Sequence, residues 1–120
     1  MFAVIRRYNT HEGSAEKIEQ RVREGFIPLV SKLPGFVSYD LVRSTEGSLV
    51  STSVFESRQS AEDSNRLASD WVHENLASLI RTAPVILSGE VIVHHASPGA
   101  ATARPRTSSD RPTETRASLS

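Results

Sequence analysis

The chain of 120 residues carries 14 basic and 14 acidic side chains, a formal net charge of zero, and no cysteine. Without cysteine, disulfides, thiolate catalysis and cysteine-ligated zinc or iron–sulfur sites are excluded. A zero net charge provides no global field that would attract nucleic acid or an anionic membrane. No apolar run approaches the roughly 20 residues that span a bilayer, and residues 1–10 do not match a secretory signal. We therefore expect a cytoplasmic, soluble protein with no nucleic-acid or membrane partner.

The first third of the chain predicts one strand and one helix. Residues 2–8 are rich in aromatic and β-branched side chains and are followed by a polar loop, which is typical of a strand. From Ser14, which suits an N-cap, apolar residues recur every three or four positions as far as Leu33 and predict an amphipathic helix. Pro28 lies inside this stripe, so we expect a kink there and the end of the helix at residues 33–35.

The middle of the chain predicts a hairpin followed by a second helix. Residues 36–43 and 49–55 read as antiparallel strands, and Gly47 suits a positive φ in the turn between them. The second helix begins near Ser57 or Ser60, and we expect Pro84 to end it. Residues 86–95 then form the last strand, where Gly89 suggests a bulge or a close backbone approach.

A change of composition divides the chain at residue 95. Residues 96–120 consist mainly of Ala, Ser, Thr, Pro and Arg, and Leu119 is their one large aliphatic residue. Such a segment cannot bury enough apolar surface to offset its ordering entropy. We predict one folded domain over residues 1–95 and a disordered tail over residues 96–120.

The order strand, helix, strand, strand, helix, strand predicts a ferredoxin-like α+β fold. In this fold a four-stranded antiparallel sheet carries both helices on one face. Strands of such a sheet should alternate apolar and polar residues. In residues 36–43, however, large apolar residues occur at even positions, such as Val42, and also at odd positions, such as Val37 and Leu41. No further helix is available to cover the second face, so we predict that a second copy of the sheet covers it in a homodimer.

Four stretches of the sequence carry a family pattern: IRRYNTHEGSAEKIEQRV, PLVSKLPGFVSYDLVRS, VFESRQSAE and ILSGEVIVHH. Over residues 1–95 they resemble the antibiotic biosynthesis monooxygenase (ABM) family of the dimeric α/β-barrel superfamily. It implies a dimeric α/β barrel. The family includes cofactor-independent oxygenases of phenolic polyketides, haem-degrading enzymes and members with no assigned activity, so the fold alone does not select an activity.

Haem degradation is disfavoured when the family pattern is placed on this sequence. Haem-degrading members use an asparagine late in the first strand, a tryptophan on the second helix and a histidine further along it. The corresponding positions here fall on Arg6, Ser64 and a residue near Glu74. Trp71 and His73 are two residues apart, so on a helix they diverge by about 160–200° and cannot replace that pair.

The resemblance implies that a substrate binds between the sheet and the second helix. Trp71, Asn65, Tyr39 and Arg6, in that order, are our candidates for the polar groups of this otherwise apolar pocket. The alternative is that Trp71 and Tyr39 are core aromatics with satisfied polar tips and that Asn65 is exposed.

No residue is assigned as catalytic, and no cofactor or metal is expected. The four histidines do not converge, and no nucleotide-binding or serine-nucleophile motif is present. Neighbouring acidic residues are better explained as solvated first turns of helices.

Three functions remain open at this point. The first is a cofactor-independent monooxygenase acting on an aromatic polyketide-like or quinol substrate, and the alternatives are a noncatalytic small-molecule binder and a dimeric interaction module. An oxygenase needs a closed cavity, typically of a few hundred cubic ångströms, and at least two polar groups that converge on one substrate oxygen. A binder needs only the cavity. A space filled by aliphatic side chains, with Trp71 pointing away, would favour the interaction module.

Overall fold

The computed structural model describes residues 1–98. The predicted domain lies entirely within this part, and residues 96–98 form neither helix nor strand. The remainder of the predicted tail, residues 99–120, lies outside the described residues.

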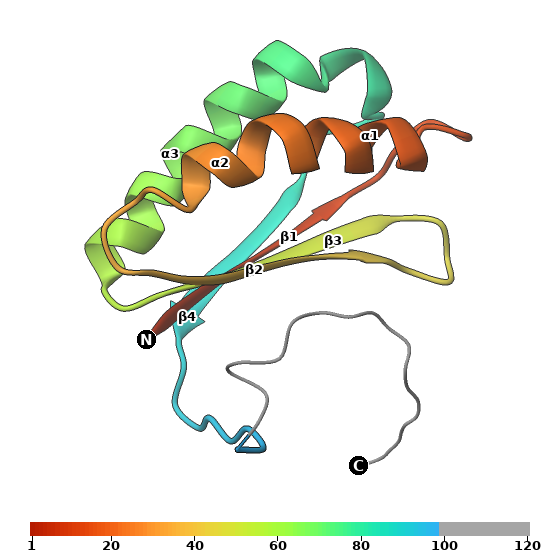
Figure 1. The fold of residues 1–120 in the computed structure, drawn as a ribbon. Coiled ribbons are helices and arrows are strands. Elements are labelled where there is room, and N and C mark those ends of the chain that lie inside the picture. The colour runs from red at the N-terminus through yellow and green to blue at the C-terminus, as the bar shows by residue number, and fades with distance from the viewer. Residues whose placement is uncertain (99–120) are drawn as a thin grey trace.

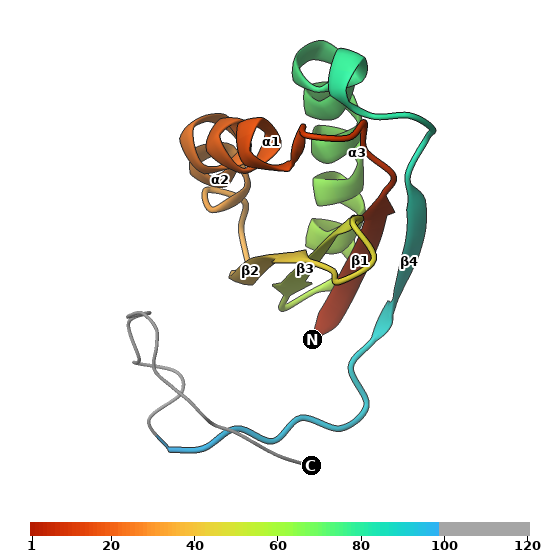
Figure 2. The ribbon, with the colours of Figure 1, turned by 90° about the vertical axis from the view of Figure 1, so that its right-hand side faces the viewer.

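Four antiparallel strands form a single sheet in the order β2-β3-β1-β4. The strands are β1 (Phe2–Tyr8), β2 (Phe36–Arg43), β3 (Leu49–Phe55) and β4 (Val85–Glu90). The helical segments are α1 (Ala15–Arg21), η1 (Val22–Phe26), α2 (Ile27–Val30), α3 (Arg58–Asn75) and η2 (Ala77–Leu79). Figure 1 and Figure 2 show α1, α2 and α3 on the same face of the sheet. The predicted ferredoxin-like fold is therefore confirmed.

The first helix is divided into three pieces around Pro28. Between α1 and α2 lies η1, a π-helical turn in which the Ile27 amide donates to the Val22 carbonyl five residues earlier. Proline has no N–H to donate, and its ring crowds the preceding turn. A π-helical turn thus lies immediately before Pro28, where the sequence predicts a kink, and the last helical piece ends at Val30, before the predicted residues 33–35.

The second helix begins at the first of its two predicted starts and ends earlier than predicted. Ser57 is its N-cap, and the Ser57 hydroxyl accepts a hydrogen bond from the Ser60 amide. The prediction that the helix continues to Pro84 is wrong, because the chain leaves helical geometry at Leu76 and buries that side chain in the core.

The last strand is shorter and more regular than predicted. β4 ends at Glu90, five residues before His95. At Gly89 there is no bulge, since the pairing of β1 with β4 is continuous, and a Cβ there would meet nothing within 4 Å among the described residues. The prediction for Gly89 is thus wrong. A register shift occurs instead in β2, between Phe36 and Ser38.

The core lies between the sheet and the helices, and the opposite face of the sheet is uncovered in the single chain. Side chains of alternate residues point to opposite faces of a strand. In β3 the residues on the helix face are all buried. On the opposite face, large apolar side chains remain 38% to 66% exposed: Ile5, Val42, Val85 and Leu87. The apolar character of both faces, which the sequence predicts, is thus observed.

The N-cap of α3 gives a direct test of this fold. Changing Ser57 to Ala removes the hydroxyl that accepts from the Ser60 amide, and should lower the free energy of unfolding by about 1 kcal/mol. Urea denaturation measures the change. Ser69→Ala is the matched control, because Ser69 is exposed within the same helix, where alanine is the better helix former. Equal effects of the two substitutions would contradict the capping role.

Candidate functional site

A small internal cavity lies between the sheet and α3. Its volume is about 20 Å³, and its walls come from β1, β2, β3, the first helix and α3. All four residues predicted from the sequence line it: Arg6, Tyr39, Asn65 and Trp71. Their convergence follows from the fold, because β1 and β2 present them from the helix face of the sheet and α3 presents them from above.

Arg6 is the most unusual residue of this cavity. It is only 4% exposed, in the middle of β1. Its Nε donates to the Tyr8 hydroxyl at 2.9 Å, and one terminal nitrogen donates to Asn65 Oδ1 at 2.9 Å. Among residues 1–98, no carboxylate lies within 4.0 Å of the guanidinium. Arginine stays charged in proteins, so a full positive charge is held here by neutral groups.

Asn65 is the partner of Arg6 on α3. It is half-buried, and its carbonyl oxygen accepts the hydrogen bond from the guanidinium. The alternative prediction that it is simply exposed is therefore wrong. With the oxygen occupied by Arg6, the amide NH₂ remains as a donor.

Tyr39 contributes a neutral phenol from β2. It is half-buried, and its ring packs at 5.5 Å against Phe26. Burial raises the pKa of the Tyr39 phenol well above its usual range, and electrostatic repulsion from Tyr8 adds to this, although the nearby Ser51 hydroxyl and Arg6 act in the opposite direction. At neutral pH Tyr39 is therefore a hydrogen-bond donor and cannot act as a base.

Trp71 is both a core residue and a wall of the cavity. It is 8% exposed, and its ring lies 5.4 Å from that of Phe26. A Cβ at Gly25 would lie 3.1 Å from Trp71 Cζ2, so the glycine in η1 leaves the room that the indole occupies. The indole thus packs against the first helix from the cavity side, as in the predicted core alternative.

Four further polar residues line the cavity but are not among the predicted pocket candidates: Tyr8, Ser51, Ser53 and Ser64. Tyr8 and Ser51 lie nearest to Arg6 in the sheet. Tyr8 lies two residues after Arg6 in β1 and therefore on the same face. Ser51 is 1% exposed on β3, and its hydroxyl has no partner in hydrogen-bonding geometry among the described residues. Strand alternation offers a signal for both, because Ser51 lies in the same parity as the buried Leu49 and Phe55.

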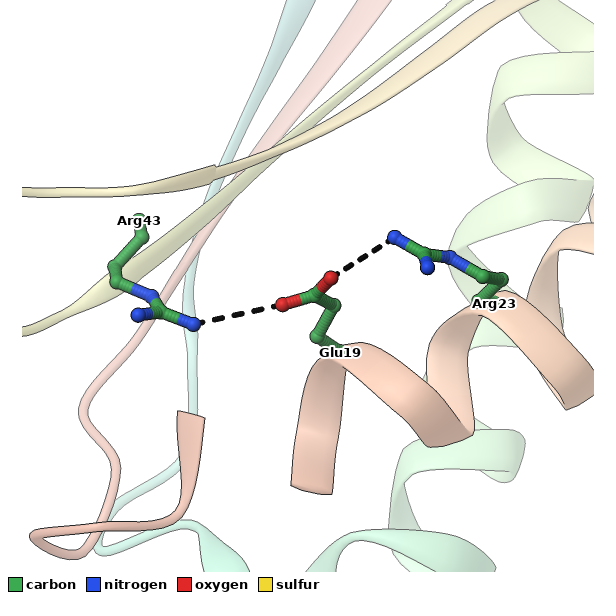
Figure 3. Close-up of polar contacts among 3 residues, drawn as sticks. All are labelled: Glu19, Arg23 and Arg43. Carbon is green, nitrogen blue, oxygen red and sulfur yellow. Dashed lines mark hydrogen bonds and ion pairs between the residues drawn. The ribbon is translucent and has the colours of Figure 1, made fainter. Parts of the chain in front are cut away.

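An open groove adjoins the cavity on the side of α1 and β2. Its volume is about 360 Å³, and Tyr39 and Leu41 lie in the walls of both spaces. Glu19 on α1 forms ion pairs in this groove with Arg23 at 2.9 Å and with Arg43 of β2 at 3.5 Å (Figure 3). Its charged residues are thus paired.

A second open cleft, called here the α3–β4 cleft, adjoins the cavity beside α3 and residues 80–84, which lead to β4. Its volume is about 380 Å³, and it shares Arg6, Val72 and Ile80 with the cavity. His73 and Arg81 also line it, whereas no acidic side chain does. Arg6 therefore lines both the internal cavity and this cleft.

The enclosed space is small compared with a ligand site. About 20 Å³ has room for a single water molecule, whereas sites for drug-sized molecules measure about 300–1,000 Å³. The cavity is thus neither filled completely nor as large as an oxygenase requires. An aromatic ligand fits only after side chains between the cavity and a cleft move, such as Tyr39 and Leu41 on one side or Val72 and Ile80 on the other.

The residues present do not fit a haem site. No histidine lines the cavity, and His73 lines the outer cleft instead. Ser64, at the family's tryptophan position, is buried and donates to the Ala61 carbonyl, while Glu74 is exposed. In residues 1–98 there is no cluster of three or more His, Asp or Glu side chains that could hold a metal ion.

The family described as antibiotic biosynthesis monooxygenase matches residues 1–69 of the sequence. The chain belongs to this ABM family. No curated protein matches it in sequence. Among the helices of residues 1–98, none is long and apolar enough to cross a membrane.

Several solved structures share the fold of this ABM protein. A monooxygenase from the gene ActVA-Orf6 of Streptomyces coelicolor, in complex with nanaomycin D, is 20% identical with a TM-score of 0.67, over 80% of this chain and 91% of that one. A mutant form of SnoaB, a cofactor-independent oxygenase from Streptomyces nogalater, is 18% identical with a TM-score of 0.60, over 78% and 94%. The haem degrader MhuD from Mycobacterium tuberculosis is 20% identical with a TM-score of 0.64, over 80% and 100%. At these identities the likeness shows the fold alone.

The buried Tyr39 phenol predicts a loss of stability at alkaline pH. An unfolded tyrosine releases its proton near pH 10, whereas the folded Tyr39 holds it to higher pH. The unfolded state therefore binds fewer protons above about pH 10, and the free energy of unfolding should fall as the pH rises through that range. Urea denaturation at pH 8 to 11 measures the fall. In Tyr39→Phe the fall should be smaller, and an equal fall in both proteins would contradict the assignment.

Proposed function

We propose that this ABM protein binds a small aromatic quinol in the cavity beneath α3 and oxidises it with dioxygen, without a metal or flavin. The observation that carries the proposal is the convergence of Arg6, Tyr39, Asn65 and Trp71 on one cavity. Two structural neighbours support it, since one is described as a cofactor-independent oxygenase and another as a monooxygenase with nanaomycin D bound.

The chemistry would depend on hydrogen-bond donors. A quinol reacts with dioxygen as its phenolate, which gives an electron directly to the oxygen molecule, so the site must favour the phenolate. Arg6, the neutral Tyr39 phenol and the Asn65 amide are all donors, and preorganised donors stabilise an oxyanion. No Asp, Glu or His lines the cavity to accept the proton. The proton would therefore leave through the adjoining clefts to water.

The absence of a base from the cavity walls favours a second candidate, a noncatalytic small-molecule binder. Binding needs the same opening of the cavity but no control of dioxygen, and the absence of a base in its walls is no obstacle. An interaction module gains less support, because it needs no buried polar cluster.

We further propose that the functional unit is a homodimer of residues 1–95 joined through the open sheet face. Ile5, Val42 and Leu87 expose apolar surface there, and a second copy would cover it without further elements. A cytoplasmic location is part of this proposal, and the absence of cysteine is compatible with a reducing compartment.

A charged side chain on the sheet face should prevent dimerisation. Val42→Lys places an ammonium group in the proposed interface, where no carboxylate is provided, so the protein should sediment as a monomer or unfold. Analytical ultracentrifugation of the wild type should give twice the chain mass of 13.2 kDa. Leu29→Lys is the control, since Leu29 is equally apolar and 42% exposed but lies on α2. A wild type that is monomeric at micromolar concentration would rule out this interface.

Oxygen uptake tests the proposed activity. Purified protein free of metal and flavin should consume oxygen with a naphthohydroquinone, and Tyr39→Phe should lower the rate about 10²- to 10³-fold because one donor is lost. An oxygen electrode measures the rate, and anaerobic incubation gives the background. Gln59→Ala, at an exposed position of α3, is the control variant and should be as active as the wild type. If the protein binds the quinol without oxygen uptake, the oxygenase proposal fails and the noncatalytic binder takes its place.

A further inference from the structure

The positive charge of Arg6 has no counter-charge among the residues described. The guanidinium is held by the Tyr8 hydroxyl and the Asn65 carbonyl oxygen, which are both neutral. Burying an ion without an opposite charge is unfavourable, and buried charges in proteins are normally paired. If Arg6 served only to join β1 to α3, a neutral hydrogen-bond donor would do so without the free-energy cost of burying a charge. The retained charge points to a partner that arrives from outside the chain.

The groups around Arg6 also lack acceptors. The two hydrogen bonds use two of the five guanidinium N–H donors. Ser51 is directly opposite Arg6 in the pairing of β1 with β3, and its buried hydroxyl has no partner in hydrogen-bonding geometry among residues 1–98. The Asn65 amide adds a further free donor beside them. A single oxygen atom carrying negative charge would accept from several of these groups at once.

The route to Arg6 carries the same sign of charge. The charged and titratable residues that line the α3–β4 cleft are Arg6, His73 and Arg81, and none of its lining residues is acidic. The groove on the other side of the cavity contains Glu19, which pairs with arginines on α1 and β2 (Figure 3). An approaching anion would thus meet a carboxylate in that groove, whereas the α3–β4 cleft presents only basic and neutral side chains to it.

We propose that the cavity is specific for organic acids, whose anionic oxygen binds Arg6 after entering through the α3–β4 cleft. The inference rests on the proposal that the cavity is a ligand site, and it specifies the class of ligand. The anionic oxygen belongs either to a carboxylate or to the phenolate of an acidic phenol. A neutral aromatic molecule of the same shape leaves the guanidinium unpaired and binds more weakly.

Matched pairs of probes test this specificity. Isothermal titration calorimetry should give at least about tenfold tighter binding of benzoate than of benzamide, and likewise of 4-nitrophenolate than of 4-nitroanisole. A preference within only one pair identifies the anion as carboxylate or phenolate. Equal affinity within both pairs, or no binding of either anion, would overturn the proposal.

Variants of Arg6 separate ligand binding from a structural role. Arg6→Met should weaken binding of the preferred anion by about 10- to 100-fold and binding of the neutral probe by much less, because a charged hydrogen bond to the anion is lost. Its melting temperature should change little, since removal of an unpaired buried charge offsets the loss of the hydrogen bonds to Tyr8 and Asn65. Arg6→Lys keeps the charge and should retain part of the preference. Arg66→Met is the control, because Arg66 follows Asn65 on α3 but is highly exposed.

The outcomes are independent of oxygen chemistry, since no probe is oxidised in these titrations. Anion preference without oxygen uptake would leave this inference standing and remove the oxygenase. Oxidation of neutral quinols by a protein that does not prefer anions would support the oxygenase and overturn the anion specificity. If Arg6→Met does not fold, the wild type and Arg6→Lys decide.

Arg81→Gln should slow association of the anion, measured by the fluorescence of Trp71, the only tryptophan, and an unchanged rate would rule out the α3–β4 entrance.

Discussion

The hydrogen bond from Arg6 to Asn65 is the contact on which the geometry of the cavity depends. It joins the central strand β1 to the long helix α3, and a second bond to Tyr8 fixes the plane of the guanidinium. Because the bond is charge-assisted and partly buried, it is stronger than a neutral one of the same length. It also holds a charge in a position where water cannot solvate it freely. The same bond thus spaces the two layers and makes the cavity receptive to an anion.

The sheet imposes a second constraint, because its two faces are both apolar and only one has helices. The helix face buries alternate residues of β1 and β3, while Ile5, Val42 and Leu87 remain exposed on the other. A single chain cannot cover both faces with the elements described. The cavity and the proposed dimer surface therefore lie on opposite sides of one sheet, and a strand residue serves one or the other according to its parity.

Most of the fold is predictable from the sequence because each element has a strong local signal. Alternation and turn residues locate β1, β2 and β3 to the residue, and a serine N-cap locates the start of α3. Interactions that depend on tertiary packing are not predictable in this way. The end of α3 is decided by burial of Leu76, and the place of the Trp71 indole by the space that Gly25 leaves in the first helix. The four candidate residues lie around one cavity, yet the pairing of Arg6 with Asn65, 59 residues apart, requires the folded chain.

The chemistry open to the cavity follows from the fact that its polar groups are mainly donors. Arg6 is permanently charged, burial keeps the Tyr39 phenol neutral, and Ser51 has a hydroxyl with no acceptor in hydrogen-bonding geometry among the described residues. Such a set cannot remove a proton, but it lowers the free energy of an oxyanion relative to the neutral molecule. For a phenol, that is equivalent to lowering its pKa on binding, by about one unit for each 1.4 kcal/mol of preferential stabilisation. A substrate that gives up its proton readily could then react with dioxygen without a base, whereas a less acidic phenol would only bind. The boundary between oxygenase and binder would accordingly be set by the acidity of the ligand as much as by the protein.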